Sequence, residues 1–322
     1  MDDMDRCSIP TPFAVGRVNC YLFVGNGLTL VDPGPATAES GDALEACLDG
    51  SGFDFGDVDR ILITHPHMDH FGIAHQIAAE SGAEVLAHTD AAPWMADPIG
   101  YFERERAYFA PYLVSMGMPD ETVDTVLDLP EPFTDYQDPV DLDRELAEGD
   151  SIDVGVDLEC VHTPGHAPGS VSFLVDSADA VLTGDHVLPE VTPNPLLTLA
   201  PGSDDERTRS LPTYLDSLHK LLDYDASVGY PGHGEPMLNL AARIHETIDH
   251  HEERKERIAG IVESEGPTTA YHIVTEMFPD LPATELYAGM SEVIGHLDLL
   301  EDEHRVRIHE KDDVLEYELD GK

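Results

Sequence analysis

The sequence predicts an α/β fold followed by a small C-terminal unit. Between residues 17 and 240, short apolar runs of β-strand length alternate with longer helical stretches. Such alternation is typical of sheets covered by helices. Near His250–Arg257 the composition changes to a highly charged stretch. The length of 322 residues suits one large domain plus a small one.

Seven strands and three helices are predicted in the larger part. Several of the apolar runs are followed by Gly or Pro, which is typical of a buried strand that ends in a turn. We predict strands at Val18–Val24, Leu28–Val31, Ile61–Thr64, Glu84–Ala87, Leu158–His162, Val171–Val175 and Ala180–Thr183. We predict helices at Ala38–Leu48, Ile73–Ser81 and Thr208–Leu222.

Residues 91–140 are longer than a simple connection and are rich in aromatic side chains. Tyr101, Phe102, Tyr108, Phe109 and Tyr112 recur at near-helical spacing, with Trp94 before them and Phe133 after them. One interpretation is a pair of helices packed on the body of the protein. The other is a lid that walls the functional cleft and sets the choice of substrate. The long loop Pro189–Pro201 is a second candidate wall.

The C-terminal unit is predicted to begin at residue 241, so that the domains are 1–240 and 241–322. A helix at Ala241–Glu263 leads into it, and a second helix follows Gly266–Thr269 and runs to Phe278. A third helix is predicted at about Glu285–Leu300, and the strands Arg305–His309 and Val314–Glu318 form a hairpin. Three helices and a hairpin are the pattern of a winged helix.

One short motif carries the strongest functional signal. The apolar run Arg60–Thr64 is followed by His65, His67, Asp69 and His70 in the pattern His-x-His-x-Asp-His. Two histidines two residues apart point to the same side of an extended segment, and the Asp-His pair that follows can reach a second nearby point. This is the ligand arrangement for two adjacent divalent metal ions.

Three later segments supply further residues of the ligand type. His166, Asp185 and His233 each follow an apolar strand-like run and lie among Gly and Pro residues. Such turns place a polar side chain at the end of a buried strand. Each signal is weak alone, because a single loop histidine is usually only a loop histidine. Together, in this order, they indicate a complete metal centre.

These motifs resemble those of the metallo-β-lactamase-fold hydrolases, in the branch similar to glyoxalase II. The resemblance covers roughly residues 8–240 and implies a four-layered αββα sandwich. It implies one metal held by His65, His67 and His166, and a second held by Asp69, His70 and His233. It also implies that Asp185 bridges the two metals. The C-terminal pattern resembles the winged-helix domain that a subset of this family carries.

Two other polar residues are candidates for orienting the ligands. Asp32, in Leu30–Gly34, matches the family's first motif, and a carboxylate can hold a ligating imidazole through its other nitrogen. The alternative is that Asp32 is only part of a Pro-Gly turn. His162 precedes His166 by four residues, and we expect it to support the ligands or the structure and not to bind metal.

The predicted chemistry is hydrolysis. Two divalent ions lower the pKa of a bridging water, so a hydroxide is available to attack an electrophilic carbonyl or phosphorus. Asp69 is the predicted catalytic residue, as a proton shuttle. We expect two zinc ions, with iron or manganese as alternatives. The predicted activity is a dinuclear zinc-dependent hydrolase of a small ester, thioester or lactone. The alternatives are a LACTB2-like metal-dependent ribonuclease and a non-enzymatic metal-binding regulator.

The charge balance predicts the environment more than the substrate. The chain holds 65 Asp and Glu against 17 Lys and Arg, a net charge of −48, and the acids are spread along its whole length. Dispersed acid with scarce lysine is typical of a halophile's surface. Residues 250–322 hold 19 acids against 7 Lys and Arg, so a nucleic-acid partner is not expected. A structural or dimerising role for this unit, with a possible homodimer, is the remaining interpretation.

Cysteines and the N-terminus bear on the compartment. The four cysteines have no Cys-x-x-Cys spacing, and Cys20, Cys47 and Cys160 are predicted to be buried free thiols. The first residues lack the basic and apolar regions of a signal peptide, and no apolar run approaches 18 residues. We therefore expect a cytoplasmic protein without a membrane partner.

Overall fold

Two β-sheets form the centre of the computed structural model, which describes residues 4–128, 135–175 and 179–320. The first sheet has six strands in sequential order: β1 (Met4–Ile9), β2 (Val18–Gly25), β3 (Gly27–Val31), β4 (Val58–Leu62), β5 (Glu84–His88) and β6 (Arg144–Leu146). The second sheet has five strands in the order β11 (Val228–Pro231), β10 (Ala180–Gly184), β9 (Val171–Val175), β8 (Asp157–His162) and β7 (Ser151–Asp153).

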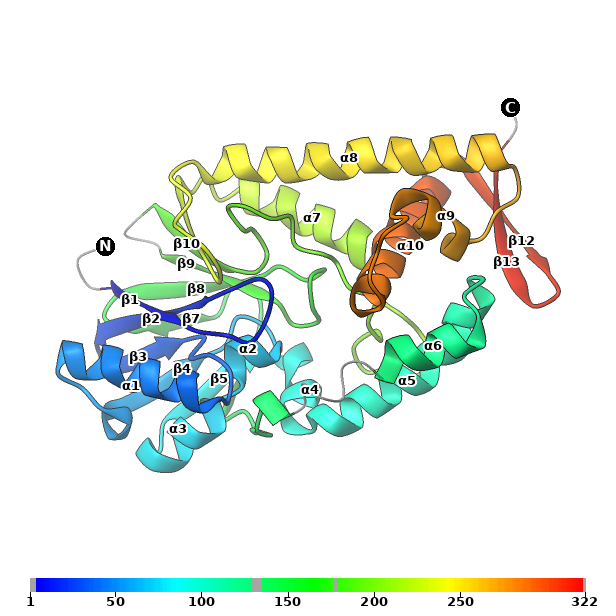
Figure 1. The fold of residues 1–322 in the computed structure, drawn as a ribbon. Coiled ribbons are helices and arrows are strands. Elements are labelled where there is room, and N and C mark those ends of the chain that lie inside the picture. The colour runs from blue at the N-terminus through cyan, green and yellow to red at the C-terminus, as the bar shows by residue number, and fades with distance from the viewer. Residues whose placement is uncertain (1–3, 129–134, 176–178, 321–322) are drawn as a thin grey trace.

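Helices cover the outer face of each sheet, which gives four layers (Figure 1). The helices α1 (Ala38–Ser51) and α3 (Ala74–Ser81) share a core with the first sheet, and α7 (Ser210–Leu222) and α8 (Leu240–Glu265) share one with the second. Strand residues alternate between layers, because successive side chains point to opposite faces. In β4, Ile61 faces the helices while Leu62 enters the core between the sheets. The predicted αββα sandwich is confirmed.

The seven predicted strands and three predicted helices are present, with ends shifted by a few residues. Four strands of the two sheets were not predicted: β1, β6, β7 and β11. Each of them lies at or next to a sheet edge, and β6 and β7 have only three residues each. Their sequences, Arg-Glu-Leu and Ser-Ile-Asp, are mostly polar, because an edge strand buries few side chains. Short 3₁₀ turns also occur at Phe55–Asp57, Thr89–Ala91 and Ala283–Glu285.

The aromatic insertion is helical. It contains α4 (Ala92–Ala96), α5 (Pro98–Ser115) and α6 (Asp120–Asp128), while Phe133 lies outside the described residues. Thus α5 and α6 form the expected helical pair. They pack mainly against the C-terminal unit, since Phe109 and Leu113 share a hydrophobic core with Ile273 and Val293. The insertion and the C-terminal unit therefore support each other.

A small C-terminal unit with strands is present, as predicted. After α8 come α9 (Ala270–Met277), α10 (Leu286–Asp302) and the antiparallel hairpin of β12 (Val306–Lys311) and β13 (Val314–Leu319). The long helix α8 joins this unit to the catalytic layers, because its first turns pack on α7 and its last turns pack on α9 and α10 (Figure 1). The element order is that of the expected winged helix, and this name and the boundary at residue 241 stay predictions.

The prediction for one cysteine is wrong. Cys47, expected to be a free thiol, forms a disulfide with Cys7, and the two Cα atoms are 6.0 Å apart. The bond joins α1 to β1 across 40 residues of sequence, a pairing that spacing alone does not reveal. Cys20 and Cys160 are buried free thiols, as predicted. Among the described residues, no helix is both long enough and apolar enough to cross a membrane.

Candidate metal centre

The seven predicted ligands lie together at the carboxyl ends of strands from both sheets. His65 and His67 follow β4, and Asp69 and His70 lie in the short helix α2 (Met68–Phe71) directly after them. His166 lies in the loop between β8 and β9. Asp185 follows β10, and His233 follows β11. Each strand ends at the same edge of the sandwich, so residues far apart in sequence meet there.

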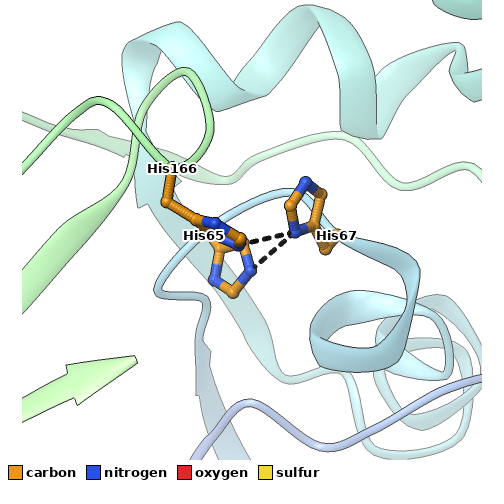
Figure 2. Close-up of side chains that lie close together, drawn as sticks. All are labelled: His65, His67 and His166. Atoms are coloured by element: carbon orange, nitrogen blue, oxygen red, sulfur yellow. Dashed lines mark hydrogen bonds between the residues drawn. The ribbon is translucent and has the colours of Figure 1, made fainter. Parts of the chain in front are cut away.

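His65, His67 and His166 form the first group (Figure 2). The Nε2 atoms of His65 and His166 lie 3.0 Å and 3.1 Å from the same atom, His67 Nδ1. The other ring nitrogen of His65 meets the Thr64 hydroxyl at 3.0 Å, and that of His166 meets the carbonyl of Asn194 at 3.0 Å. The Asn194 carbonyl can only accept, and the Thr64 hydroxyl donates its hydrogen to Asp32, so each Nδ1 carries a hydrogen and both Nε2 lone pairs point at His67.

Asp69, His70 and His233 form the second group. The Nε2 atom of His233 lies 3.3 Å from a carboxylate oxygen of Asp69, while its Nδ1 faces the carbonyl of Arg17 at 2.9 Å. A carbonyl accepts hydrogen bonds only, so the neutral ring carries its hydrogen on Nδ1 and presents the Nε2 lone pair to the carboxylate. Two acceptors that face each other in a buried site need a cation between them.

Asp185 lies between the two groups. One carboxylate oxygen is 3.5 Å from His70 Nε2, and the other is 3.5 Å from His233 Nε2 and 4.0 Å from His166 Nε2. Space here is tight: a Cβ on Gly232 would lie 2.3 Å from Asp185 Oδ1 and 2.7 Å from the His70 ring. Glycine at this position therefore lets the backbone approach the centre closely.

Asp32 holds His70 in place. Its Oδ2 lies 2.9 Å from His70 Nδ1, and its two oxygens also accept hydrogen bonds from the backbone N–H and the hydroxyl of Thr64, at 2.8 Å and 2.7 Å. The arrangement leaves His70 Nε2 free to face Asp185. A buried carboxylate that orients a ligand imidazole in this way also raises the basicity of the ring. Asp32 adopts a positive φ of 56°, a backbone conformation that residues other than glycine rarely adopt.

The electrostatics of the centre favour a cation. Burial lowers the pKa of His67 to about 3, so this ring is neutral, the form that binds metal. Burial alone would raise the pKa of Asp185, yet His233 and His70 hold it well below its usual range. Burial alone would lower the pKa of His70, yet Asp185, Asp32 and Asp69 raise it well above its usual value. The carboxylates thus attract positive charge into a buried site.

Buried polar atoms without partners test whether metal ions fit this centre. Among the described residues, His70 Nε2, Asp185 Oδ1 and His233 Nε2 are buried and make no hydrogen bond. Such atoms are costly unless something binds them. They lie together, because one Asp185 carboxylate oxygen is 3.5 Å from His70 Nε2 and the other is 3.5 Å from His233 Nε2. Imidazole nitrogens and carboxylate oxygens are the donors that zinc, iron and manganese accept, so the residues fit metal ions of this kind.

His162 lies away from this centre. Its ring stacks on His88 at 3.8 Å between ring centres, and its Nε2 lies 3.9 Å from Asp90. Its backbone N–H donates to Glu148. In the described part of the chain, none of these contacts involves one of the seven predicted ligands. Of the two roles expected for His162, support of the ligands is backed by none of these contacts, and a structural role stays a prediction. His186, next to Asp185, is also buried, and its ring packs edge-on against Tyr214.

An apolar cavity of about 220 Å³ adjoins the centre at His67. Its wall comes from the aromatic insertion, from Leu196–Thr198 in the loop after Asp185, and from Tyr287 on α10. Both segments that the sequence suggested as pocket walls contribute. Tyr287 and Glu105 were not predicted, because no motif marks them and only the packing of α10 on α5 brings Tyr287 there.

Glu105 in the cavity wall predicts a pH-dependent stability. Burial raises its pKa to about 7 against 4.5 for a free side chain, although the Leu199 N–H donates to it and Arg104 lies near. Because the pKa of Glu105 is raised in the folded state, its contribution to the free energy of unfolding is fully present below pH 4.5. That contribution is lost as the pH rises through 7. We expect Glu105→Gln to have a higher free energy of unfolding than wild type. The gain should be up to about 3 kcal/mol at pH 8 and less than about 1 kcal/mol at pH 5.

Chemical denaturation at both pH values measures this difference in the free energy of unfolding. Glu103→Gln is the matched control, because Glu103 lies exposed on the same helix and the substitution removes the same charge. A Glu105→Gln gain equal at pH 5 and pH 8 would contradict the assigned ionisation.

Comparison with known proteins agrees with the fold and the centre. Residues 14–233 match the family model described as the metallo-beta-lactamase superfamily. The probable metallo-hydrolase YqjP of Bacillus subtilis is 32% identical over 305 residues, which cover 95% of this chain and 94% of that protein. The thioesterase pkgB of Emericella nidulans is 26% identical over 270 residues, 81% of this chain and 60% of its own length.

A solved structure extends the similarity over the whole chain. A metallo-beta-lactamase family protein of Thermus thermophilus superposes with a TM-score of 0.82 at 28% identity, and the match covers 99% of both chains. The superposition therefore includes the aromatic insertion and the C-terminal unit as well as the sandwich.

Proposed function

The chain belongs to the metallo-beta-lactamase superfamily of metallo-hydrolases, and we propose that it uses two zinc ions to hydrolyse a small ester, thioester or lactone. The observation that carries the proposal is the convergence of seven buried or half-buried ligand-type side chains whose tautomers and charges suit cations. Bound there, divalent ions would supply hydroxide at neutral pH and polarise the substrate carbonyl. A hydrolase needs no further nucleophile from the chain.

The side chains of the centre have distinct tasks in this proposal. His65, His166 and His233 are held by hydrogen bonds from Nδ1, so each presents Nε2 without reorganisation during the reaction. Asp69 lies beside His233 Nε2 at 3.3 Å, and its second role would be to accept the proton of the attacking water and pass it to the leaving group. Neighbouring His70 keeps the pKa of Asp69 low despite burial, so the carboxylate is ready to accept.

The predicted ligands suit zinc, although none of them is a thiolate. All seven predicted ligands are imidazoles or carboxylates, and the free cysteines Cys20 and Cys160 belong to the sandwich core. Zinc, iron and manganese all accept such donors, so metal analysis of the purified protein decides among them.

The substrate class is supported by what borders the centre. The adjoining cavity is largely apolar, which suits the acyl part of an ester or thioester. The thioesterase pkgB, similar over most of this chain, is named for thioester cleavage.

A ribonuclease is the second candidate, and the C-terminal unit argues against it. Its α10 would be the recognition helix of a winged helix, yet Glu292 and Asp298 on it are buried and paired with Arg254 and Arg207. Most of α10 is buried among α7, α8 and α9. A helix in this position has no face to offer a groove. A regulator that binds DNA through α10 meets the same objection.

A panel of substrates with and without chelator tests the proposed function. Para-nitrophenyl esters, acyl thioesters, lactones and a short RNA are offered to the purified protein at high KCl. We expect ester or thioester cleavage that chelator abolishes and that added zinc restores, because the centre generates the nucleophile. Turnover that survives complete metal removal would reject the mechanism, and RNA cleavage without ester cleavage would favour the second candidate.

A further inference from the structure

The cavity beside His67 has a shape that points to a particular kind of substrate. Its lining is apolar for the most part, and it comes from His67 and Met68, the aromatic insertion, Leu196–Thr198 and Tyr287. At its near end, the ring of His67 contacts Trp94 at 5.5 Å between centres. Trp94 in turn stacks on Tyr101 at 4.9 Å and 19°. The cavity therefore begins directly at a predicted metal ligand.

The cavity continues along one face of α5. The residues of α5 that line it are spaced by three or four along the helix: Pro98, Tyr101, Phe102, Glu105, Arg106 and Phe109. From the first to the last of them, the helix rises about 16 Å at 1.5 Å per residue. The buried side chains of Phe109, Val126 and Leu127 wall the far part. The space is therefore long and leads away from the centre.

Most polar groups in this wall are already engaged. The Tyr287 hydroxyl donates to the carbonyl of Leu197 at 2.7 Å, and Glu105 accepts from the Leu199 N–H at 3.1 Å. The Arg106 guanidinium pairs with Asp128 at 2.8 Å. Among the buried polar atoms of the described wall, Gln137 Oε1 and Arg106 Nε have no hydrogen-bond partner, so few buried groups are available to a polar substituent. A sugar, nucleotide or peptide needs many more partners.

We propose that this cavity binds the acyl chain of the substrate and that the substrate is an ester or thioester of an acid with an extended apolar chain. The inference rests on the proposed hydrolysis. In a thioester, the reaction breaks the bond from the acyl carbon to sulfur and forms a bond from that carbon to a water oxygen. The products are the carboxylate, a proton and the free thiol, and the thiol side stays outside the cavity.

Trp94 makes chain binding measurable apart from catalysis. It is the single tryptophan of the protein and it lines the cavity, so tryptophan fluorescence reports on this place alone. The purified full-length protein is titrated with straight-chain alcohols from butanol to dodecanol, which are not hydrolysed. We expect the affinity to rise about three- to fourfold with each methylene until the cavity is filled, and then to level off. An affinity independent of chain length would overturn the proposal.

Matched variants test where the bound chain lies in the cavity. Val126→Phe enlarges a side chain in the far wall, whereas Val123→Phe makes the same change three residues earlier in the same helix and core, outside the wall. We expect Val126→Phe to weaken the longest alcohols at least about tenfold and to shift the plateau to shorter chains, since it displaces two or more methylenes. Val126→Ala is a second variant in case Val126→Phe does not fold. It enlarges the cavity and should move the plateau to longer chains. Equal effects of the two Phe variants, or an unmoved plateau in Val126→Ala, would overturn the assignment.

Hydrolysis rates separate this inference from the function on which it rests. With acyl thioesters of rising length, kcat/KM should rise with the chain in wild type and fall for the long chains in Val126→Phe. Chelator-sensitive hydrolysis that ignores chain length would leave the proposed function standing and overturn the acyl cavity. Length-dependent binding of alcohols without cleavage of any ester or thioester would overturn the proposed function and retain an apolar-chain site.

Discussion

Asp185→Ala is expected to lose metal and hydrolysis together, with a fall in kcat/KM above the roughly 10- to 100-fold typical of residues that only orient a ligand. Its carboxylate faces His70, His233 and His166 at 3.5, 3.5 and 4.0 Å, so it contacts both ligand groups. Removal leaves three imidazoles without the negative charge between them. Metal content by mass spectrometry and ester hydrolysis at saturating zinc are the two measurements.

Two control variants sharpen this expectation. Asp32→Asn keeps an oxygen near Thr64 and loses the charge beside His70, so its loss should be smaller, about 10- to 100-fold in metal affinity or activity. Asp216→Ala removes an exposed carboxylate from α7 and should leave both measurements unchanged. Asp185→Ala protein that keeps two metals per chain with a native circular dichroism spectrum would refute the assignment of Asp185 as the bridge.

The sequence predicted those parts of the centre that depend on local order. His65, His67, Asp69 and His70 lie within six residues, so their spacing alone brings them together once β4 ends. His166, Asp185 and His233 were candidates from their place after strand-like runs, but their grouping with the other ligands needed the resemblance, because it depends on the order of five strands in two sheets. Apolar runs of strand length identified seven of the strands, whereas the four layers were predicted from the family resemblance.

Other features depend on packing between elements that are far apart in sequence, so no local sequence pattern indicates them. His162 follows a strand next to a ligand loop, yet it stacks on His88 from the other sheet. The partner of Cys47 lies on β1, a strand whose polar residues Asp5 and Arg6 conceal its place in the sheet. Tyr287 contributes to the cavity because α10 packs against the insertion. No sequence pattern indicated this interface, since each of the two segments was predicted as a separate unit.

The midpoint of thermal unfolding is expected to rise by roughly 10 °C or more between 0.1 and 2 M KCl, since each kcal/mol of relieved repulsion is worth about 2–3 °C at this size. The net charge of −48 is dispersed over the surface, as at Asp42, Glu45 and Asp49 on the exposed face of α1. Salt shortens the screening length from about 10 Å at 0.1 M to about 3 Å at 1 M, so repulsion between neighbouring acids fades. A midpoint that stays flat or falls with KCl would contradict this.

Salt also weakens attractive ion pairs. The direction in which KCl moves the thermal midpoint therefore depends on whether the relief of repulsion or the loss of ion pairs is larger. Exposed ion pairs such as Arg209 with Asp302 contribute only about 0.2–1 kcal/mol each. The 17 Lys and Arg residues limit their number, while 65 acids repel one another, so relief of repulsion outweighs the lost pairs. The triple variant Asp42→Asn, Glu45→Gln, Asp49→Asn removes like charges spaced three and four apart, which repel along a helix. It should raise the midpoint at 0.1 M KCl and leave it unchanged at 2 M, because screening has already removed that repulsion in wild type. A gain of equal size at both concentrations would assign the effect to helix propensity instead of charge.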